Sequence, residues 1–298
     1  MNNGKRAKSF FATSIWAVLA TCVLHLDVCT EPCLSDTANV AAKFDDKWAV
    51  VIGVGDFTEA GWTIKYATKD ATDIRSYLIE HANFKSDHVR DLIGSHSTQA
   101  NVLRSIEWLG AVARPGDLAV IYIRTRGTYP SLDAAGKRYF ALSDTTAATL
   151  AKTGIEMAGF VDKVLMKVHS KAIAIIVDSD FAENSFQMGS PELPDEKIFP
   201  ADHTLVVACS TFDDQICWES ERLHNSVFTH ALLEALASPK ASGSLLEALS
   251  KANANIPLEM QQIRPNRSQD MQAAGLTRGC ECFDVDLAVP PTRPRKAP

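Results

Sequence analysis

Short apolar runs alternate along the chain with stretches in which apolar residues recur every three or four positions. The continuous runs cover residues 47–55, 117–123, 171–178 and 203–209, with a weaker one at 88–94. Runs of this length are typical of parallel strands covered on both faces. Amphipathic stretches, which predict helices, cover 66–81, 98–112, 155–168, 229–236 and 244–255. The alternation predicts an α/β fold, an α/β/α sandwich around a mainly parallel central sheet.

Two arginines follow the predicted strand at 117–123. Arg124 and Arg126 stand where the chain should turn, and in open α/β sheets functional groups gather at the carboxyl ends of the strands. A dinucleotide site is not expected after the first strand, because Thr58 stands where the glycine fingerprint needs its third glycine. We therefore expect no cofactor, and look for the site around the two arginines.

The N-terminus predicts a targeting segment. Lysines and an arginine precede an apolar run at 9–26, the order typical of a secretory signal. We assign residues 1–26 to a signal peptide cleaved after Ala20, or alternatively to a membrane anchor. In either case the protein is expected to be exported, to the periplasm or outside the cell, and an uncleaved anchor would associate it with a membrane.

Composition limits the classes of partner. The formal net charge is -6 and 46% of the 298 residues are hydrophobic, which favours one globular domain and argues against nucleic-acid binding. The predicted organisation is a linker at 27–46, a domain at 47–287 and a disordered Pro-rich tail at 288–298.

Outside the apolar run the chain has an even set of cysteines, which suits disulfides in an oxidising compartment, although the sequence does not determine which cysteines pair. They are Cys29, Cys33, Cys209, Cys217, Cys280 and Cys282.

Several segments, in their order along the chain, resemble the caspase and metacaspase superfamily, especially its bacterial caspase-like members. They are "WAVVIGVGDF", "KDATDI", "YFALSDT", "AIIVDSDFAENSF" and, most specifically, "NSVFTHALLEAL". The resemblance implies a caspase-like three-layer sandwich and, in an active member, a cysteine-type endopeptidase. In that family one strand ends in a Ser-Gly-His-Gly-like turn with the catalytic histidine, and the next ends in an Asp-x-Cys turn with the nucleophile.

Both catalytic positions differ here. The resemblance places Arg124 on the motif's serine, Arg126 on its histidine and Asp180 on its cysteine. Arginine stays protonated and cannot serve as a general base, and a carboxylate is a weak nucleophile. We therefore expect a pseudopeptidase without an intact dyad, which binds a protein or peptide partner.

Metacaspases cut after Arg or Lys, using carboxylates around a specificity pocket. The resemblance maps these to Asp70, Asp144 and Asp178, and we expect them to form a substrate-binding pocket beside Arg124. Arg126 is expected to supply the cation that a buried Asp180 needs. The same residues are compatible with a helix cap at Asp70, a turn at Asp144 and solvated arginines.

Two other functions remain open. One is an active cysteine endopeptidase, which family membership alone favours. Cys209 is interpreted as a small buried hydrophobe rather than a replacement nucleophile, and His224 as a surface or cap residue. The other is a metal-binding hydrolase using the acidic cluster, although the two arginines argue against a vacant cation site and we expect no metal. The partner's identity and the oligomeric state do not follow from the sequence.

Overall fold

The computed structural model describes residues 44–185, 197, 199, 201–238, 243–278 and 284–288. These residues all belong to one compact unit, Ala41–Pro298. The predicted signal or anchor, nearly all of the predicted linker and all but Ala288 of the predicted tail lie outside the described residues, as do four of the six cysteines considered above. Within the described ranges, none of the helices has the length and apolar character needed to cross a membrane.

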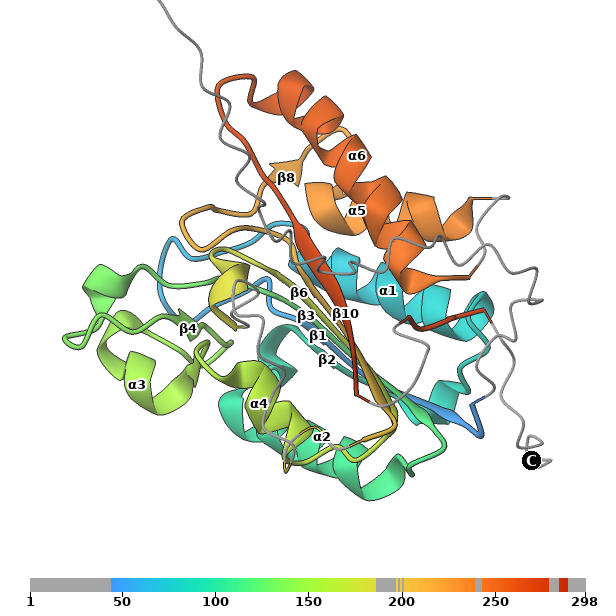
Figure 1. The fold of residues 1–298 in the computed structure, drawn as a ribbon. Helices are drawn as coiled ribbons and strands as arrows, with labels where there is room; N and C mark the ends of the chain where they lie inside the picture. Colours follow the sequence, from blue (N-terminus) through green and yellow to red (C-terminus); the bar gives the residue numbers. More distant parts are fainter. Residues whose placement is uncertain are drawn as a thin grey trace, which may run out of the picture. The chain divides into compact units, whose positions relative to one another are not determined.

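A six-stranded sheet forms the centre of the fold, in the order β10-β7-β6-β3-β1-β2 (Figure 1). Five strands run parallel, and β10 pairs antiparallel with β7 at one edge. The mainly parallel sheet confirms the predicted fold class. The strands are β1 (Lys47–Gly53), β2 (Val89–Ile93), β3 (Leu118–Thr125), β6 (Ala172–Ser179), β7 (His203–Cys209) and β10 (Gln272–Arg278).

Helices cover both faces of the sheet and complete the three layers (Figure 1). One hydrophobic cluster lies between the sheet and α1, α5 and α6, and a second lies between the sheet and α2 and α4. The helices are α1 (Ala67–Glu80), α2 (Gln99–Val112), α3 (Leu150–Thr153), α4 (Phe160–Leu165), α5 (Val227–Ala237) and α6 (Leu245–Ile263). Short 3-10 turns occupy Ser86–His88, Gly94–His96, Pro130–Leu132, Ala147–Thr149 and Ala182–Ser185.

Two small hairpins lie outside the main sheet. The strand β4 (Tyr139–Phe140) pairs with β5 (Ile155–Glu156), and β8 (Glu219–Ser220) pairs with β9 (Asn225–Ser226). The helix predicted at 155–168 is therefore wrong in its first part, since β5 occupies the start and α4 begins only after Gly159, whose φ of +67° interrupts regular structure.

The last helix, α6, is longer than predicted. It continues past Asn255 to Ile263 with Pro257 in its interior, although proline removes one helical hydrogen bond. Ile256 and Met260 are both buried in the core on either side of the proline. This burial holds the helix together and places its C-terminal end beside the site described next.

Candidate functional site

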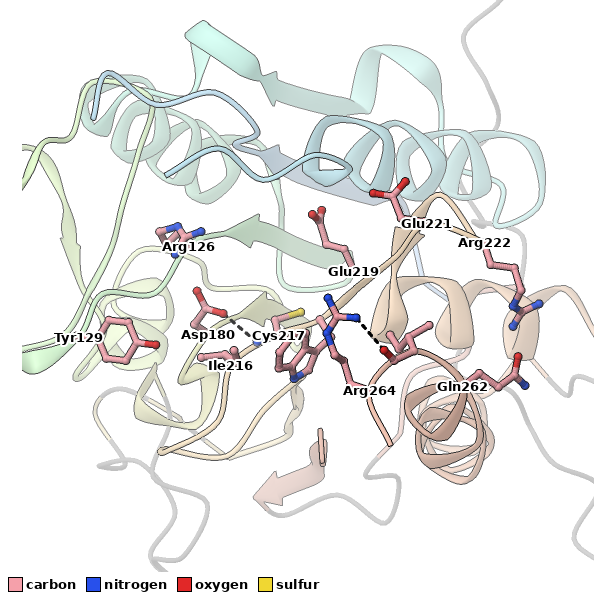
Figure 2. Close-up of a pocket in the computed structure, with 12 residues that line it drawn as sticks. Arg126, Tyr129, Asp180, Ile216, Cys217, Glu219, Glu221, Arg222, Gln262 and Arg264 are labelled. Carbon is pink, nitrogen blue, oxygen red and sulfur yellow. Dashed lines mark hydrogen bonds between the residues drawn. The ribbon is translucent and has the colours of Figure 1, made fainter. Parts of the chain in front are cut away.

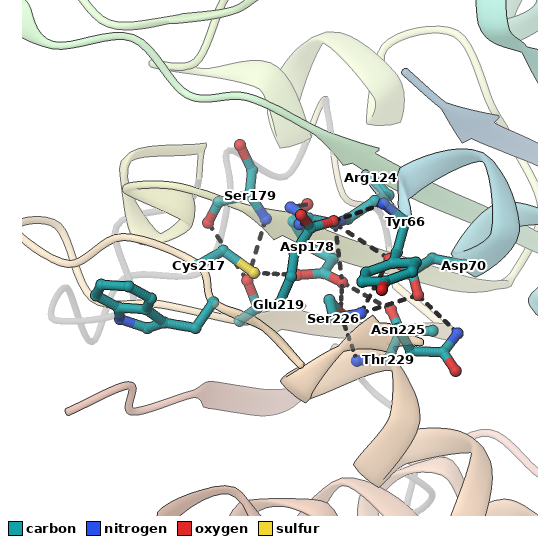
Figure 3. A network of polar contacts seen from close by, with 12 residues as sticks. Tyr66, Asp70, Arg124, Asp178, Ser179, Cys217, Glu219, Asn225, Ser226 and Thr229 are labelled. Atoms are coloured by element: carbon teal, nitrogen blue, oxygen red, sulfur yellow. Dashed lines mark hydrogen bonds and ion pairs between the residues drawn. The ribbon is translucent and has the colours of Figure 1, made fainter. Parts of the chain in front are cut away.

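Arg124 is a buried cation at the carboxyl end of β3, with a side chain that is only 2% exposed. Its Nε lies 3.3 Å from Asp70 Oδ2 and 3.7 Å from Asp178 Oδ2, and its terminal nitrogen lies 3.7 Å from Glu219 Oε1 (Figure 3). The parallel register places Arg124 beside Asp178 on β6. Three carboxylates from α1, β6 and β8 therefore enclose a single guanidinium, and we call these four residues the arginine cluster.

The first carboxylate, Asp70, is held by the segment that leads into α5. Its Oδ1 accepts hydrogen bonds from Asn225 Nδ2 at 2.8 Å and from the Ser226 backbone N–H at 3.0 Å. Burial raises the pKa of Asp70 to about 7, against the opposing effect of the Arg124 guanidinium. Asp70 thus joins α1 to α5 instead of capping the start of its own helix.

The second carboxylate, Asp178, accepts from three side chains. Ser226, the N-cap of α5, and Thr229 donate their hydroxyls to Oδ2, and the Cys217 thiol donates to Oδ1 at 2.9 Å. Burial raises the pKa of Cys217 well above its usual range, so the thiol keeps the proton that it donates. Both oxygens of Asp178 are thereby occupied within the protein.

Arg126 and Asp180 lie in the turns that follow β3 and β6, and the backbones of these two turns approach each other closely. Gly127 allows the close approach, because a Cβ at this position would lie 2.0 Å from the Asp180 carbonyl oxygen. Asp180 Oδ1 accepts from the Cys217 backbone N–H at 2.9 Å, and burial raises the pKa of Asp180 while Arg124 and Arg126 oppose the rise. These contacts bring the two predicted positions into one site.

The expected direct ion pair between Arg126 and Asp180 is not formed among the described residues. Arg126 instead donates its Nε to the Trp62 carbonyl at 3.1 Å, which holds the guanidinium away from the carboxylate. The ion pairs with Asp70 and Asp178 are made by Arg124. The structure therefore places Arg124, and not Arg126, in direct ion pairs with the carboxylates that the sequence analysis singled out.

An open pocket of about 620 Å³ lies next to the arginine cluster (Figure 2). Its walls come from the turns after β3 and β6, the loop before β8, the β8–β9 turn and the end of α6. The lining residues are Arg126, Tyr129, Asp180, Ile216, Cys217, Trp218, Glu219, Glu221, Arg222, Gln262, Ile263 and Arg264. Both dyad positions inferred from the resemblance, Arg126 and Asp180, line this pocket.

The predicted group of three specificity carboxylates is only partly assembled. Asp70 and Asp178 lie together around Arg124, whereas Asp144 is exposed in the turn after β4 and is not among the pocket's lining residues.

Cys209 is a fully buried free thiol, as interpreted from the sequence, and burial raises its pKa to about 12. His224 is exposed, with a φ of +54°.

Five polar residues of the site were not expected there from the sequence, and one of them, Cys217, was considered only for a disulfide but is a free thiol. Cys217 lies in the loop before β8 and Glu219 begins β8, while Asn225 and Ser226 form β9 and Thr229 lies in the first turn of α5. A serine just before a helix start is an N-cap signal, but it does not reveal that its hydroxyl and that of Thr229 reach Asp178. Within the described residues, no group of three or more acidic, His or Cys side chains has an arrangement suited to a metal ion.

A three-layer α/β/α sandwich with its polar groups at the carboxyl ends of central parallel strands is the architecture of caspase-like proteins. A family model for the caspase domain matches residues 46–277, and the chain therefore belongs to the caspase domain family. No curated protein sequence matches the chain significantly.

Two solved structures share the fold. A protein from Geobacter sulfurreducens aligns with a TM-score of 0.55 and 15% identity, covering 83% of this chain and 98% of its own. Caspase-1 from Spodoptera frugiperda aligns with a TM-score of 0.55 and 14% identity, covering 85% of this chain and 94% of its own. At these identities the likeness establishes the fold alone.

Proposed function

We propose that this chain is a catalytically inactive caspase-like domain, a pseudopeptidase that is exported and binds a protein or peptide. The observation that carries the proposal is the burial of Arg124 among Asp70, Asp178 and Glu219. In a relative that cuts after Arg or Lys, such carboxylates would receive the cation of the substrate. Here an arginine of the chain itself holds that position.

The dyad positions support the same proposal. Peptide cleavage by a thiol enzyme needs a thiolate and a base that later protonates the leaving amine. Arg126 cannot accept a proton at physiological pH, and Asp180 carries no thiol. Loss of the nucleophile or base in a protease lowers turnover by up to about a millionfold, whereas groups that only bind peptide are not affected.

A second candidate function, an active cysteine endopeptidase, draws on the position of Cys217 in the pocket. Its thiol would have to replace the missing nucleophile. Against this, its S–H donates to Asp178, burial raises its pKa, and no histidine lines the described pocket. We therefore favour binding without catalysis.

The test is a peptidase assay on the purified domain with fluorogenic Arg, Lys and Asp peptides. The expected result is no turnover above a heat-denatured sample, by the wild-type protein and by Cys217→Ser alike. Turnover that a thiol-directed inhibitor stops and that Cys217→Ser abolishes would establish the second candidate instead. Turnover unaffected by both would contradict the proposal and point away from thiol chemistry.

Export is tested separately, because it depends on residues 1–26 and not on the site. A reporter that folds only in an oxidising compartment, fused after Asp36, should become active in a bacterial host. A matched fusion beginning at Asp36 should stay inactive. Equal activity of the two fusions would contradict export by this segment.

A further inference from the structure

The carboxylates that line the open pocket already have partners within the protein. Glu219 accepts from the backbone N–H groups of Lys65 and Tyr66 and faces Arg124, and Glu221 accepts from the Lys65 ammonium and the Tyr66 hydroxyl. Asp180 accepts from the Cys217 backbone, and burial raises the pKa of its carboxyl group, which favours the neutral form. The acidic lining therefore has little capacity left for a cationic ligand.

The arginines of the pocket differ in this respect. Arg222 forms an ion pair with Glu259, but neither Arg126 nor Arg264 forms one with a carboxylate of the described chain. Arg126 uses Nε for the Trp62 carbonyl, and Arg264 uses one terminal nitrogen for the Ile263 carbonyl. The other N–H groups of these two guanidiniums are donors that the described residues leave available to a ligand.

Apolar surface adjoins these donors. The Arg264 guanidinium lies over the Trp218 ring, 5.3 Å from its centre, and Tyr129, which is 52% exposed, lines the same pocket as Arg126. Figure 2 shows Arg126 and Tyr129 toward one end of the pocket, with Arg264 nearer its middle. A volume of about 620 Å³ is within the range of pockets that bind small ligands and short peptide segments.

From this charge arrangement we propose that the open pocket binds a peptide carboxylate, held by Arg126 and assisted by Arg264, with neighbouring peptide side chains against Trp218 and Tyr129. The carboxylate is either the C-terminus of a peptide or an Asp or Glu side chain. Guanidinium groups pair with both in the same bidentate geometry. The inference rests on the proposed function, because it describes what a domain that does not cleave peptides would hold.

The proposal separates the roles of the two arginines after β3. Arg124 neutralises Asp70 and Asp178 and is 2% exposed, so it is structural and a ligand cannot reach it without opening the cluster. Arg126, two residues later, is partly exposed in the pocket. A ligand that competes for Arg124 would have to break a buried ion cluster, whereas a ligand at Arg126 breaks none.

The experiment measures fluorescence anisotropy of four N-terminally labelled peptide pools with the full mature protein. The first pool has neutral side chains and a free C-terminus, and the second has an amidated C-terminus and one central Asp or Glu. The third is neutral and amidated, and the fourth is amidated with one central Arg. We expect the first or the second pool to bind at least about tenfold more tightly than the third and fourth, the equivalent of one charge-assisted hydrogen bond.

Variants connect the binding to the pocket. Arg126→Gln should weaken binding of the preferred pool by about ten- to a hundredfold, and Arg126→Lys should weaken it less because it keeps the charge. Arg267→Gln is the matched control, since this exposed arginine lies three residues after Arg264 outside the pocket lining and should leave affinity unchanged. Thermal unfolding of each variant verifies that it is folded.

The outcomes separate this inference from the proposed function. Failure of both carboxylate pools to bind, equal or tighter binding of the Arg pool, or unchanged affinity in Arg126→Gln would each overturn the carboxylate site and leave the lack of catalysis standing. Cleavage of any pool, detected by mass spectrometry, would instead contradict the proposed function. Preference between the first and second pools identifies the source of the carboxylate.

Discussion

Replacing Arg124 with methionine tests whether this residue neutralises the buried carboxylates. Arg124→Met keeps much of the side-chain volume but removes the cation that lies 3.3 Å from Asp70 and 3.7 Å from both Asp178 and Glu219. Breaking a buried ion pair by removing one partner costs about 3–5 kcal/mol. For a domain of this size each kcal/mol lowers Tm by about 2–4 °C, so we expect a decrease of roughly 6–20 °C near neutral pH.

The stability that Arg124→Met loses should depend on pH, and the structure determines in which direction. Arg124 lowers the pKa of Asp70, which burial raises from 3.8 to about 7, so removing Arg124 raises that pKa further. A folded-state pKa above the unfolded value means that the folded protein holds a proton that the unfolded chain has released. Stability then falls as pH rises through this window and is regained on acidification. Arg124→Met should therefore lose more stability relative to wild type at about pH 8 than at about pH 5.

The assay is thermal unfolding of wild type and variant across this pH range. Lys251→Met is the control, because it removes an exposed cation whose partner Glu247 is also exposed and should change stability by no more than about 1 kcal/mol. Millimolar methylguanidinium should raise the Tm of the companion variant Arg124→Ala, which leaves the guanidinium position empty, and not that of the control. A loss in Arg124→Met that is the same at both pH values, together with an Arg124→Ala variant that is insensitive to methylguanidinium, would refute charge neutralisation and leave only a packing defect.

Three further predictions concern other parts of the fold. Lys47 is fully buried, its ammonium donates to two backbone carbonyls, and burial lowers its pKa from 10.5 to about 8. The stability of the wild-type protein should therefore rise between about pH 8 and pH 10, by at most about 3 kcal/mol. Chemical unfolding curves of Lys47→Met should lack this rise. Gly127→Ala should destabilise the domain by about 1–3 kcal/mol in the same curves, since its Cβ would collide with the Asp180 carbonyl; an unchanged midpoint would mean that this turn is not tightly packed. Restoring the dyad with Arg126→His and Asp180→Cys should give little peptidase activity on Arg peptides, and adding Arg124→Ser, which removes the guanidinium from between the carboxylates, should raise that activity. Equal activity of the double and triple variants would contradict the idea that Arg124 occupies the position of a substrate's arginine.

The central strands were predictable because their burial leaves a direct mark on the sequence. The run at 203–209 coincides with β7, and the runs before Arg124 and Asp178 end within two residues of β3 and β6. The antiparallel edge strand β10 was missed, since Gln272–Arg278 has a glycine at its centre and only intermediate burial over most of its length. An edge strand needs less apolar surface, so hydrophobic periodicity carries little signal there.

The candidate site was predictable where strand ends determine it, and not where loops do. Arg124 and Asp178 are neighbours because the parallel register of β3 and β6 brings the ends of two consecutive apolar runs together. Cys217 reaches the same place through a loop whose path no local pattern specifies. Asp144 is the converse case, a residue that was expected in the site but lies exposed in a turn. The motif around it does not determine the direction of the chain after β4.

The spacing of the two arginines explains why they have different environments. Residues i and i+2 of a strand project to the same face, so Arg124 and Arg126 would share partners if β3 continued. The strand ends at Thr125, and the chain then turns so that Gly127 forms an isolated bridge to Phe140. Arg124 thus projects from the last regular part of the strand into the carboxylates of α1 and β6, while Arg126 projects from the turn toward the Trp62 carbonyl and the open pocket. Because the first arginine already neutralises the buried acids, the second keeps its charge available, which is the condition that a carboxylate ligand requires.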